Sequence, residues 1–434
     1  MDILVIGFAL FAMFFGAGNL IFPPMLGYIY GDKWLLASIA FTIVGVGLTL
    51  LAVVSMAKSH GNIFSFTSLA GSKLSKTIIL IIALCIGPLG AIPRTAATSF
   101  EMVESAGFNI NIFVFTLIFF SFSLFLALAK NSVVDFIGKF LTPLLLLSLL
   151  IMIIVGMVNP IGQINKIDLN LSKIFSDSML EGYNTMDALA ALAFTPIIVE
   201  SVIKKGYKNN LLIKTIQASL IAVIGLAFVY ISLTFLGASA SKSIDTDSRV
   251  ILLNFISEEI LGSKGKFVLL VAIIMACFTT SIGLISSISK IFVEFSNNRF
   301  DYKLVAFTIA IVSLLLSILG VESIVRLTGP FLQFVYPLAI MLVIFNLIGK
   351  DRINKRLIKN SFLVVSLVSF MDALVSLIDI LSDMFNISLS FSMEIELILK
   401  NIIKVISLNI VDFPWVFPVI LTIILTSIYL KFKK

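Results

Sequence analysis

Charged side chains are scarce in this chain of 434 residues: Asp, Glu, Lys and Arg make up 13% of it, whereas hydrophobic residues make up 59%. A soluble globular protein carries about 25% charged residues, which keep its surface hydrated. With about half that proportion, the chain has too little polar side chain to cover one or two soluble domains. The composition therefore excludes an ordinary soluble protein.

Cysteine and histidine are almost absent, with two cysteines and one histidine. Cys85 and Cys277 lie within apolar segments, so we expect small buried residues rather than disulfide partners. His60 lies in a polar connector without a cluster of cysteines or carboxylates around it, which argues against a zinc-type site. These absences predict that the protein holds no cofactor.

Signatures of catalysis are missing as well. The sequence has no His-Glu-x-x-His motif, no Gly-x-Ser-x-Gly elbow and no Gly-x-x-x-x-Gly-Lys-Ser/Thr phosphate loop. An enzyme inside a membrane would need a catalytic dyad or a metal cluster at membrane depth. We therefore expect a protein that is not an enzyme.

Long apolar runs, by contrast, recur along the whole chain. A run of about 18 residues or more crosses the roughly 30 Å hydrocarbon core of a bilayer as a helix. The runs predict an all-α protein of about twelve transmembrane helices that resides in the lipid bilayer, with no soluble domain. The expected spans are residues 3–30, 34–57, 77–103, 110–129, 133–158, 184–203, 211–237, 266–289, 304–320, 324–348, 361–381 and 412–430.

The net charge of +7 is distributed over short clusters between the apolar runs. Such clusters indicate membrane topology rather than a nucleic-acid surface. Connectors on the side of the amino terminus are the more basic, whereas those on the opposite side mix lysines with carboxylates. By the positive-inside rule, both termini are expected in the cytoplasm, which agrees with an even number of spans. The basic side includes Lys58, Lys130, Lys204, Lys205, Lys208, Lys290, Lys350, Arg352, Lys355 and Arg356.

Two connectors on the opposite side are long and partly amphipathic. The apolar spacing in residues 247–262 predicts a short helix, which is either a structural cap or a moving lid. Residues 392–408 carry Glu396, Lys400 and Lys404 at four-residue intervals, so one helix face is hydrated. We interpret this second segment as an interfacial helix rather than a further span.

The first apolar run contains strong helix breakers at its centre. Gly16-Ala17-Gly18-Asn19 is followed by Pro23-Pro24, and inside a helix glycine costs about 1 kcal/mol and proline about 3 kcal/mol relative to alanine. A turn that opens here frees amides for a carboxylate and carbonyls for a small cation. The alternative is a kink that only shapes helix packing.

A second interruption is expected at Thr195-Pro196, near the centre of the sixth span. Corresponding breaks in two halves of a chain point to a transporter site built on inverted repeats. We therefore predict repeats at residues 1–160 (helices 1–5) and 161–348 (helices 6–10), with discontinuous helices 1 and 6. Residues 349–434 would contribute two appended helices, 11 and 12.

Three consecutive hydroxyl side chains, Thr279, Thr280 and Ser281, lie at the middle of the eighth span. A single hydroxyl in a membrane helix usually bonds back to its own helix, and that is the simpler alternative here. Three in succession point in different directions, however. Two hydroxyl oxygens together with freed carbonyls would form a cage of neutral oxygens that suits sodium.

Few ionisable residues fall within the spans, and such residues are functional candidates by default. We single out Arg94, Glu101 and Asp187 as candidates for gating or coupling. Arg94 follows a proline within a span and is a candidate gate. Asp187 is the best candidate if protons rather than sodium drive transport. Others are Glu200, Arg326, Asp372 and Asp379.

Three segments carry a resemblance to a known family: FALFAMFFGAGNLIFPP (8–24), IGPLGAIPRTAATSFE (86–101) and GYNTMDALAALAF (182–194). On these segments the chain resembles the bacterial branched-chain amino acid carriers, sodium-coupled symporters of leucine, isoleucine and valine. The resemblance covers essentially the whole chain. It implies the five-plus-five inverted-repeat fold typified by the bacterial leucine transporter, a place in the bacterial cytoplasmic membrane, and a monomer or weak oligomer.

The resemblance also implies a substrate site. Gly16, Ala17, Gly18 and Asn19 match the unwound Gly-x-Gly-Asn of that fold, with the amides of Ala17 and Gly18 facing the substrate carboxylate. Asn19 would lie beside a cation. Ala193 and Phe194 would wall the pocket for the substrate side chain.

A sodium site is implied in the same way. The carbonyls of Ala12, Phe15 and Ala276 and the hydroxyls of Thr279 and Thr280 would bind the coupling ion. The second sodium site of the leucine transporter has hydroxyl-bearing positions that are Leu189 and Ala191 here, so we expect one sodium. The expected function is sodium-coupled import by alternating access. The alternatives are a proton-coupled transporter of another small neutral solute, and a channel.

Overall fold

The computed structural model describes residues 2–129, 142–349, 352–385, 390–407 and 413–432. The regular structure of these residues is entirely helical, which confirms the all-α class. Residues 133–141 of one expected span, and the expected topology signals Lys130 and Lys350, lie outside the described residues. The helices are α1 (Asp2–Phe14), α2 (Ala17–Tyr30), α3 (Trp34–Thr42), α4 (Thr49–Lys58), α5 (Ile63–Thr67), α6 (Ser72–Ile86), α7 (Ala91–Ser105), α8 (Ile112–Leu128), α10 (Thr142–Val158), α11 (Leu171–Asn184), α12 (Asp187–Lys204), α13 (Leu211–Ala240), α14 (Arg249–Phe295), α15 (Tyr302–Ser317), α16 (Val321–Ile348), α17 (Lys355–Phe385), α18 (Ser390–Ser407) and α19 (Val416–Phe432).

Seven helical stretches among the described residues are long and apolar enough to cross a membrane. Shorter apolar helices, such as α8, α15 and α19, lie where the remaining spans are expected. Together these elements overlap every span that the sequence predicts. The seven stretches are Ala17–Lys58, Ser72–Ser105, Leu171–Lys204, Lys208–Ala240, Leu269–Phe295, Val321–Ile348 and Lys355–Ile380.

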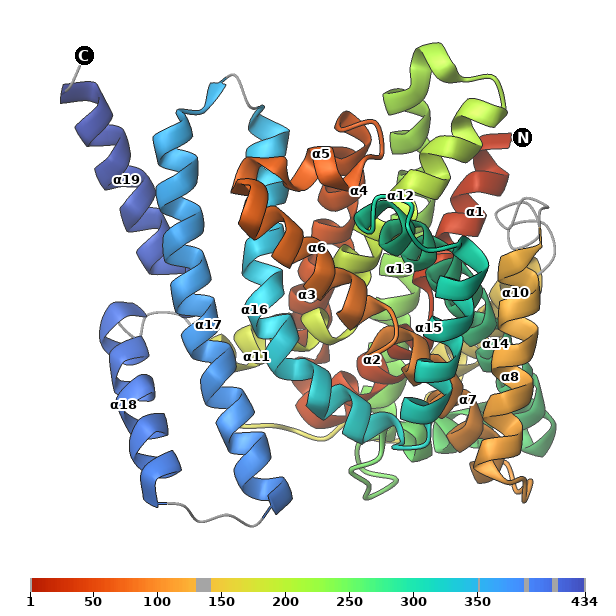
Figure 1. The fold of residues 1–434 in the computed structure, drawn as a ribbon. Coiled ribbons are helices and arrows are strands. Elements are labelled where there is room, and N and C mark those ends of the chain that lie inside the picture. Colours follow the sequence, from red (N-terminus) through yellow and green to blue (C-terminus); the bar gives the residue numbers. More distant parts are fainter. Residues whose placement is uncertain (1, 130–141, 350–351, 386–389, 408–412, 433–434) are drawn as a thin grey trace.

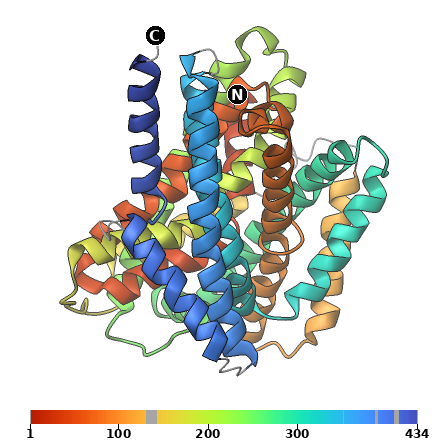
Figure 2. The same ribbon diagram turned by 60° about the vertical axis from the view of Figure 1, so that its left-hand side comes forward.

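The helices form a bundle with α1, α2, α12 and α14 at its core. Helices α8, α10 and α15 flank it on one side, and α17, α18 and α19 on the other (Figures 1 and 2). The beginning of α1 and the end of α19 lie at the same end of the molecule (Figure 1). Large apolar side chains are exposed on the flanking helices, for example Phe125 at 71% and Leu367 at 57%. A bilayer, rather than water, is the solvent in which such a surface is stable.

The first span is broken as expected, because α1 ends at Phe14 and α2 begins at Ala17. Helix α2 then packs closely on α13 at two glycines. A Cβ on Gly27 would lie 1.7 Å from the Thr234 carbonyl oxygen, and one on Gly237 would lie 1.8 Å from the Pro24 carbonyl oxygen. Only glycine permits this approach, which holds the last turns of α13 against the second half of α2.

The second break lies earlier in the chain than the sequence predicts. Helix α11 ends at Asn184 and α12 begins at Asp187, with Met186 in the left-handed conformation at φ 64°. Pro196 is inside the continuous α12, so the predicted interruption at Thr195-Pro196 is wrong. One missing amide is tolerated there, since the Thr195 hydroxyl donates to the Ala191 carbonyl at 2.6 Å and supports the turn before the proline.

The two amphipathic connectors are helical. Arg249–Leu261 forms the first part of α14, and Gly262, at φ 67°, separates it from the apolar part. Helix α18 corresponds to the expected interfacial segment and lies beside the lower half of α17 in Figure 1. Lys400 on its hydrated face is 3.6 Å from Asp379 of α17.

Candidate functional site

The break between α1 and α2 exposes the beginning of α2. The Gly16 amide donates to the Phe14 carbonyl at 2.8 Å and to Asn19 Oδ1 at 3.2 Å. A Cβ on Gly16 would lie 2.8 Å from Thr280 Oγ1, so the break fits closely against α14. The next amides, those of Ala17 and Gly18, belong to the first turn and have no carbonyl partner within α2. They form the positive end of a helix dipole.

A buried polar cluster connects this break with the break in the sixth span. Asn19 Nδ2 donates to both carboxylate oxygens of Asp187, at 3.0 and 2.8 Å. The Tyr230 hydroxyl donates to Asp187 Oδ2 at 2.5 Å and also contacts Asn19. The three residues are at most 2% exposed. Because Asp187 directly follows the α11–α12 break, Asn19 links the two interruptions.

Arg94 of α7 occupies the space between the two breaks. Its Nη1 donates to the Asn184 carbonyl at 2.6 Å and its Nη2 to the Thr185 carbonyl at 3.3 Å. A Cβ on Gly18 would lie 2.9 Å from Nη2, so the guanidinium also abuts the first turn of α2. The carbonyl end of α11 is the negative end of its dipole and stabilises this buried cation.

These groups line a small cavity of about 20 Å³. A site for a small organic ligand normally has about 300 Å³ or more. The helices must therefore separate before a small organic ligand enters. The lining residues are Met13, Phe14, Gly16, Ala17, Gly18, Asn19, Ala91, Arg94, Thr95, Thr185, Met186, Asp187, Ala190, Thr280 and Leu284.

Most of the oxygens expected to bind sodium lie together beside this cavity. Thr279 Oγ1 is 2.8 Å from both the Ala12 and the Ala276 carbonyl oxygens. Thr280 Oγ1 is 3.0 Å from the Met13 carbonyl oxygen. Both hydroxyls thus bond to α1, and Thr279 bonds to its own helix as well, whereas the packing alternative predicts bonds within the helix alone. The contact of Thr280 is with Met13 rather than with Phe15.

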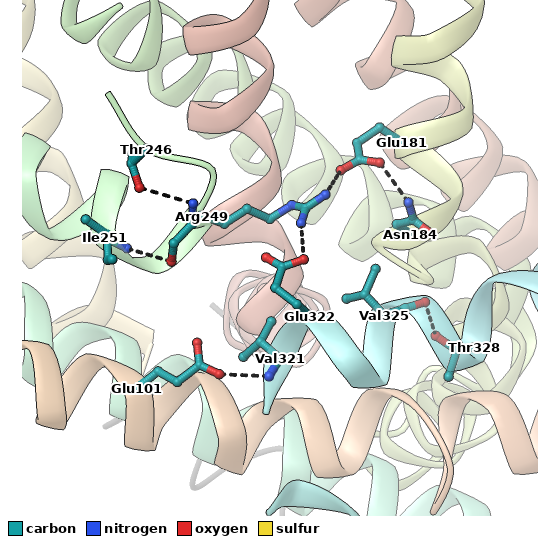
Figure 3. Close-up of polar contacts among 11 residues, drawn as sticks. Glu101, Glu181, Asn184, Thr246, Arg249, Ile251, Val321, Glu322, Val325 and Thr328 are labelled. Carbon is teal, nitrogen blue, oxygen red and sulfur yellow. Dashed lines mark hydrogen bonds and ion pairs between the residues drawn. The ribbon is translucent and has the colours of Figure 1, made fainter. Parts of the chain in front are cut away.

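The remaining candidates lie farther from the cavity. Ala193 and Phe194 are buried one turn beyond Ala190, and the Phe194 ring packs against Phe14 with a centroid distance of 5.7 Å. Glu101 accepts the Val321 amide at 2.8 Å, at the start of α16 (Figure 3). Of the three candidates for gating or coupling, the structure brings Arg94 and Asp187 to the cavity and places Glu101 outside it.

An ion-pair network lies beyond Phe22, on the side of the short helix that begins α14. Arg249 Nη2 is 3.0 Å from Glu181 of α11, and its Nη1 is 2.5 Å from Glu322 of α16 (Figure 3). Burial lowers the pKa of Arg249, but the two carboxylates outweigh this and raise the pKa above its usual value. The guanidinium groups of Arg94 and Arg249 lie 5.4 and 5.2 Å from the Phe22 ring centroid.

Sequence reasoning missed Tyr230, the Thr185–Met186 break and Arg249. Tyr230 carried a faint signal, as a tyrosine in the middle of an apolar run. Arg249 stood in a connector, where a charge is ordinarily a topology signal. Its two carboxylate partners are far away in the sequence, so only the fold reveals the network.

Comparison with known proteins places this site in context. The family model described as "Branched-chain amino acid transport protein" matches residues 1–433. A Staphylococcus epidermidis protein, provisionally named a branched-chain amino acid carrier, is 39% identical over 384 residues, which are 83% of this chain and 85% of that protein. A Staphylococcus haemolyticus protein with the same provisional name is 37% identical over 391 residues, 85% of this chain and 87% of that protein.

Solved transporter structures share the fold. Mhp1, a nucleobase-cation-symport-1 family transporter in a closed conformation with bromovinylhydantoin bound, has a TM-score of 0.61 at 15% identity, covering 96% of this chain and 90% of that chain. MhsT in complex with L-phenylalanine has a TM-score of 0.58 at 17% identity, covering 86% and 97%. Likeness at such low identity concerns the architecture alone.

Proposed function

The chain belongs to the family of branched-chain amino acid transport proteins, and from that premise we propose that it imports leucine, isoleucine and valine with sodium across the bacterial cytoplasmic membrane. It is a multi-pass membrane protein and not an enzyme. The observation that carries the proposal is the pair of helix breaks joined by the Asn19–Asp187 contact. Irregular backbone inside a bilayer is tolerated only where protein or a cavity covers it, and transporter sites are built there.

The substrate carboxylate would bind the first amides of α2, from Ala17 and Gly18. The side chain of the substrate would lie against the apolar lining, which includes Met13, Phe14 and Leu284. An apolar pocket discriminates by only about 1–3 kcal/mol per methylene. Leucine, isoleucine and valine should therefore all be accepted. Widening of the cavity would bring Phe194, behind Phe14, within reach of the side chain.

The coupling ion would occupy the oxygen cage between α1 and α14. The Ala12 and Ala276 carbonyls already converge on Thr279 Oγ1 at 2.8 Å, and Phe15 and Thr280 would complete the set. The proposed ligands are neutral oxygens, which favours sodium over a proton. Sodium would hold the end of α1 against α14 and so order the break at which the amino acid binds.

Alternating access would proceed from a twelve-span, inverted-repeat architecture with both termini in the cytoplasm. Arg249 connects α11 and α16 above Phe22, so its ion pairs would close the outer path. The short helix that begins α14 would then be a moving lid rather than a fixed cap. Opening on either side would require only rigid movements of helices around the site.

A proton-coupled carrier is the second candidate, and the buried Asp187 favours it. A carboxylate inside a membrane protein is a frequent proton carrier. Vesicles with an imposed gradient separate the two candidates. Purified protein in proteoliposomes should accumulate radiolabelled leucine with an inward sodium gradient at equal pH on both sides. Uptake driven by a proton gradient without sodium would contradict sodium coupling, and absence of counterflow would contradict a carrier.

A further inference from the structure

The cavity between the helix breaks carries opposite charges. Asp187 and Arg94 both line it, and they are 2% and 3% exposed. Arg94 abuts Gly18 in the first turn of α2, where helix amides add a positive potential. Asp187 lies at the beginning of α12, across the cavity's other helix break, and accepts from Asn19. The cavity thus offers one group suited to an anion and one suited to a cation, close together.

The contacts of Asp187 leave it able to bind a cation. Its carboxylate accepts from three neutral groups, Asn19 Nδ2 and the hydroxyls of Tyr230 and Thr185, and the charge of Arg94 also acts on it. A carboxylate has about four lone-pair sites, so these three donors do not saturate it. The guanidinium of Arg94 is directed to the Asn184 and Thr185 carbonyls.

We propose that Asp187 binds the α-ammonium group of the substrate, while Arg94 and the first amides of α2 bind its α-carboxylate. This inference rests on the proposed function, because it assigns groups of the same cavity to the two ends of an amino acid. The site thereby selects for a charged amino group. An α-hydroxy acid with the leucine side chain leaves Asp187 buried without its cationic partner, and a site built around such a pair rejects it.

The test compares L-leucine with (S)-2-hydroxy-4-methylpentanoate, each radiolabelled in turn, for binding to the purified full-length protein. Wild type should prefer leucine by about 100-fold or more. Asp187→Asn should weaken leucine binding by about 30-fold or more, since an ammonium loses its charged partner. Binding of the hydroxy acid should change less than about threefold, so the preference collapses.

Equal weakening of both compounds in Asp187→Asn would overturn the proposal and make Asp187 a structural residue. An unchanged preference would also overturn it, including the case in which only the proton dependence of uptake changes. The matched control is Asp372→Asn, which removes a carboxylate from α17 and should leave the preference as in wild type. A wild-type protein that binds no leucine contradicts the proposed function instead, so the two failures are distinguishable.

If Asp187→Asn fails to fold, Asp187→Glu serves in its place. The longer side chain keeps the negative charge but displaces it by one methylene. We expect leucine affinity to fall by about tenfold, with little change for the hydroxy acid. An equal change for both compounds in this variant would overturn the proposal.

Discussion

Asn19 is the residue that connects the two helix breaks. Its Oδ1 accepts from Gly16 and its Nδ2 donates to Asp187. Asn19→Leu removes both contacts and leaves a buried carboxylate short of a donor, a loss of about 1–3 kcal/mol or more. We expect leucine uptake, normalised to inserted protein, to fall at least about 30-fold. Transport at the wild-type rate would remove Asn19 from the site.

Thr279 is the residue that tests the sodium cage. Thr279→Val preserves shape but removes the oxygen that lies 2.8 Å from the Ala12 and Ala276 carbonyls. The sodium concentration for half-maximal uptake should rise about tenfold, because the binding free energy of sodium loses about as much as one hydrogen bond contributes. Ser287→Ala is the control, because the Ser287 hydroxyl donates to the Gly283 carbonyl of its own helix. An equal sodium response in both variants would argue against the cage.

At the residue scale, the sequence predicts residues that are unusual within their own helix, but not residues whose role depends on contacts between distant helices. Gly16, Asn19 and Thr279 are unusual for the middle of a membrane helix, and that mismatch reveals them in the sequence. Tyr230 gives only a faint signal of this kind, since an aromatic residue suits a membrane helix. Its role follows from the close packing of α13 on α2, which the sequence does not display.

The first part of α14 is the element that tests the outer closure. Arg249→Gln removes the charge that holds α11 and α16 together through Glu181 and Glu322. A cysteine at Ala190, which lines the cavity, reports access when Cys85 and Cys277 have been replaced. We expect a membrane-impermeant thiol reagent added outside to label this cysteine about tenfold faster in Arg249→Gln. The reason is that the substitution removes partly exposed ion pairs, which are worth about 1 kcal/mol.

The control for this measurement is Lys242→Gln, which removes an exposed basic side chain from the same side of the protein. Its labelling rate should match that of the parent. Acceleration by both substitutions would indicate a general effect of charge. No acceleration by Arg249→Gln would show that the network is a fixed cap.

The crossing of α2 and α13 is the element on which the geometry of the site depends. Gly237→Ala places a Cβ 1.8 Å from the Pro24 carbonyl oxygen, so the helices must separate. We expect a loss of about 3 kcal/mol of stability, at the upper end for overpacking, and weaker leucine binding. Gly329→Ala is the control, because a Cβ there meets nothing within 4 Å. The measurement is the melting temperature of the two variants in detergent. Equal melting temperatures would contradict the close crossing of α2 and α13.

At the element scale, the first break was predictable and the second was misplaced. Gly16, Gly18 and Asn19 lower helix stability within four successive residues, so the chain opens there. Pro196 removes one amide only, and the Thr195 hydroxyl supports the carbonyl side of the same turn. The actual break at Thr185–Met186 contains neither glycine nor proline. It depends on Arg94, which binds the carbonyls of Asn184 and Thr185 from another helix.

At the scale of the whole molecule, hydropathy predicts the architecture because a bilayer imposes it: each apolar run must be helical and long enough to cross. The observed helices overlap every expected span. Hydropathy does not determine how the spans are arranged around the breaks. That arrangement comes from contacts such as Asn19–Asp187 and Thr279–Ala12, which join segments far apart in the sequence.

On the proposed function, the Thr279–Ala12 and Gly16–Asn19 contacts would make sodium and leucine binding interdependent across the molecule. Thr279 contacts the end of α1 and Asn19 contacts the residue before α2, so each ligand would order the break that the other requires. Linkage demands that sodium raise leucine affinity by the same factor as leucine raises sodium affinity, typically about 5–150-fold. Thermal stabilisation by both ligands together should therefore exceed the sum of their separate effects. Thr279→Val should abolish this excess while retaining stabilisation by leucine alone. Additive stabilisation in the wild-type protein would show that the two sites act independently, and the coupling through the α1–α2 break would then be wrong.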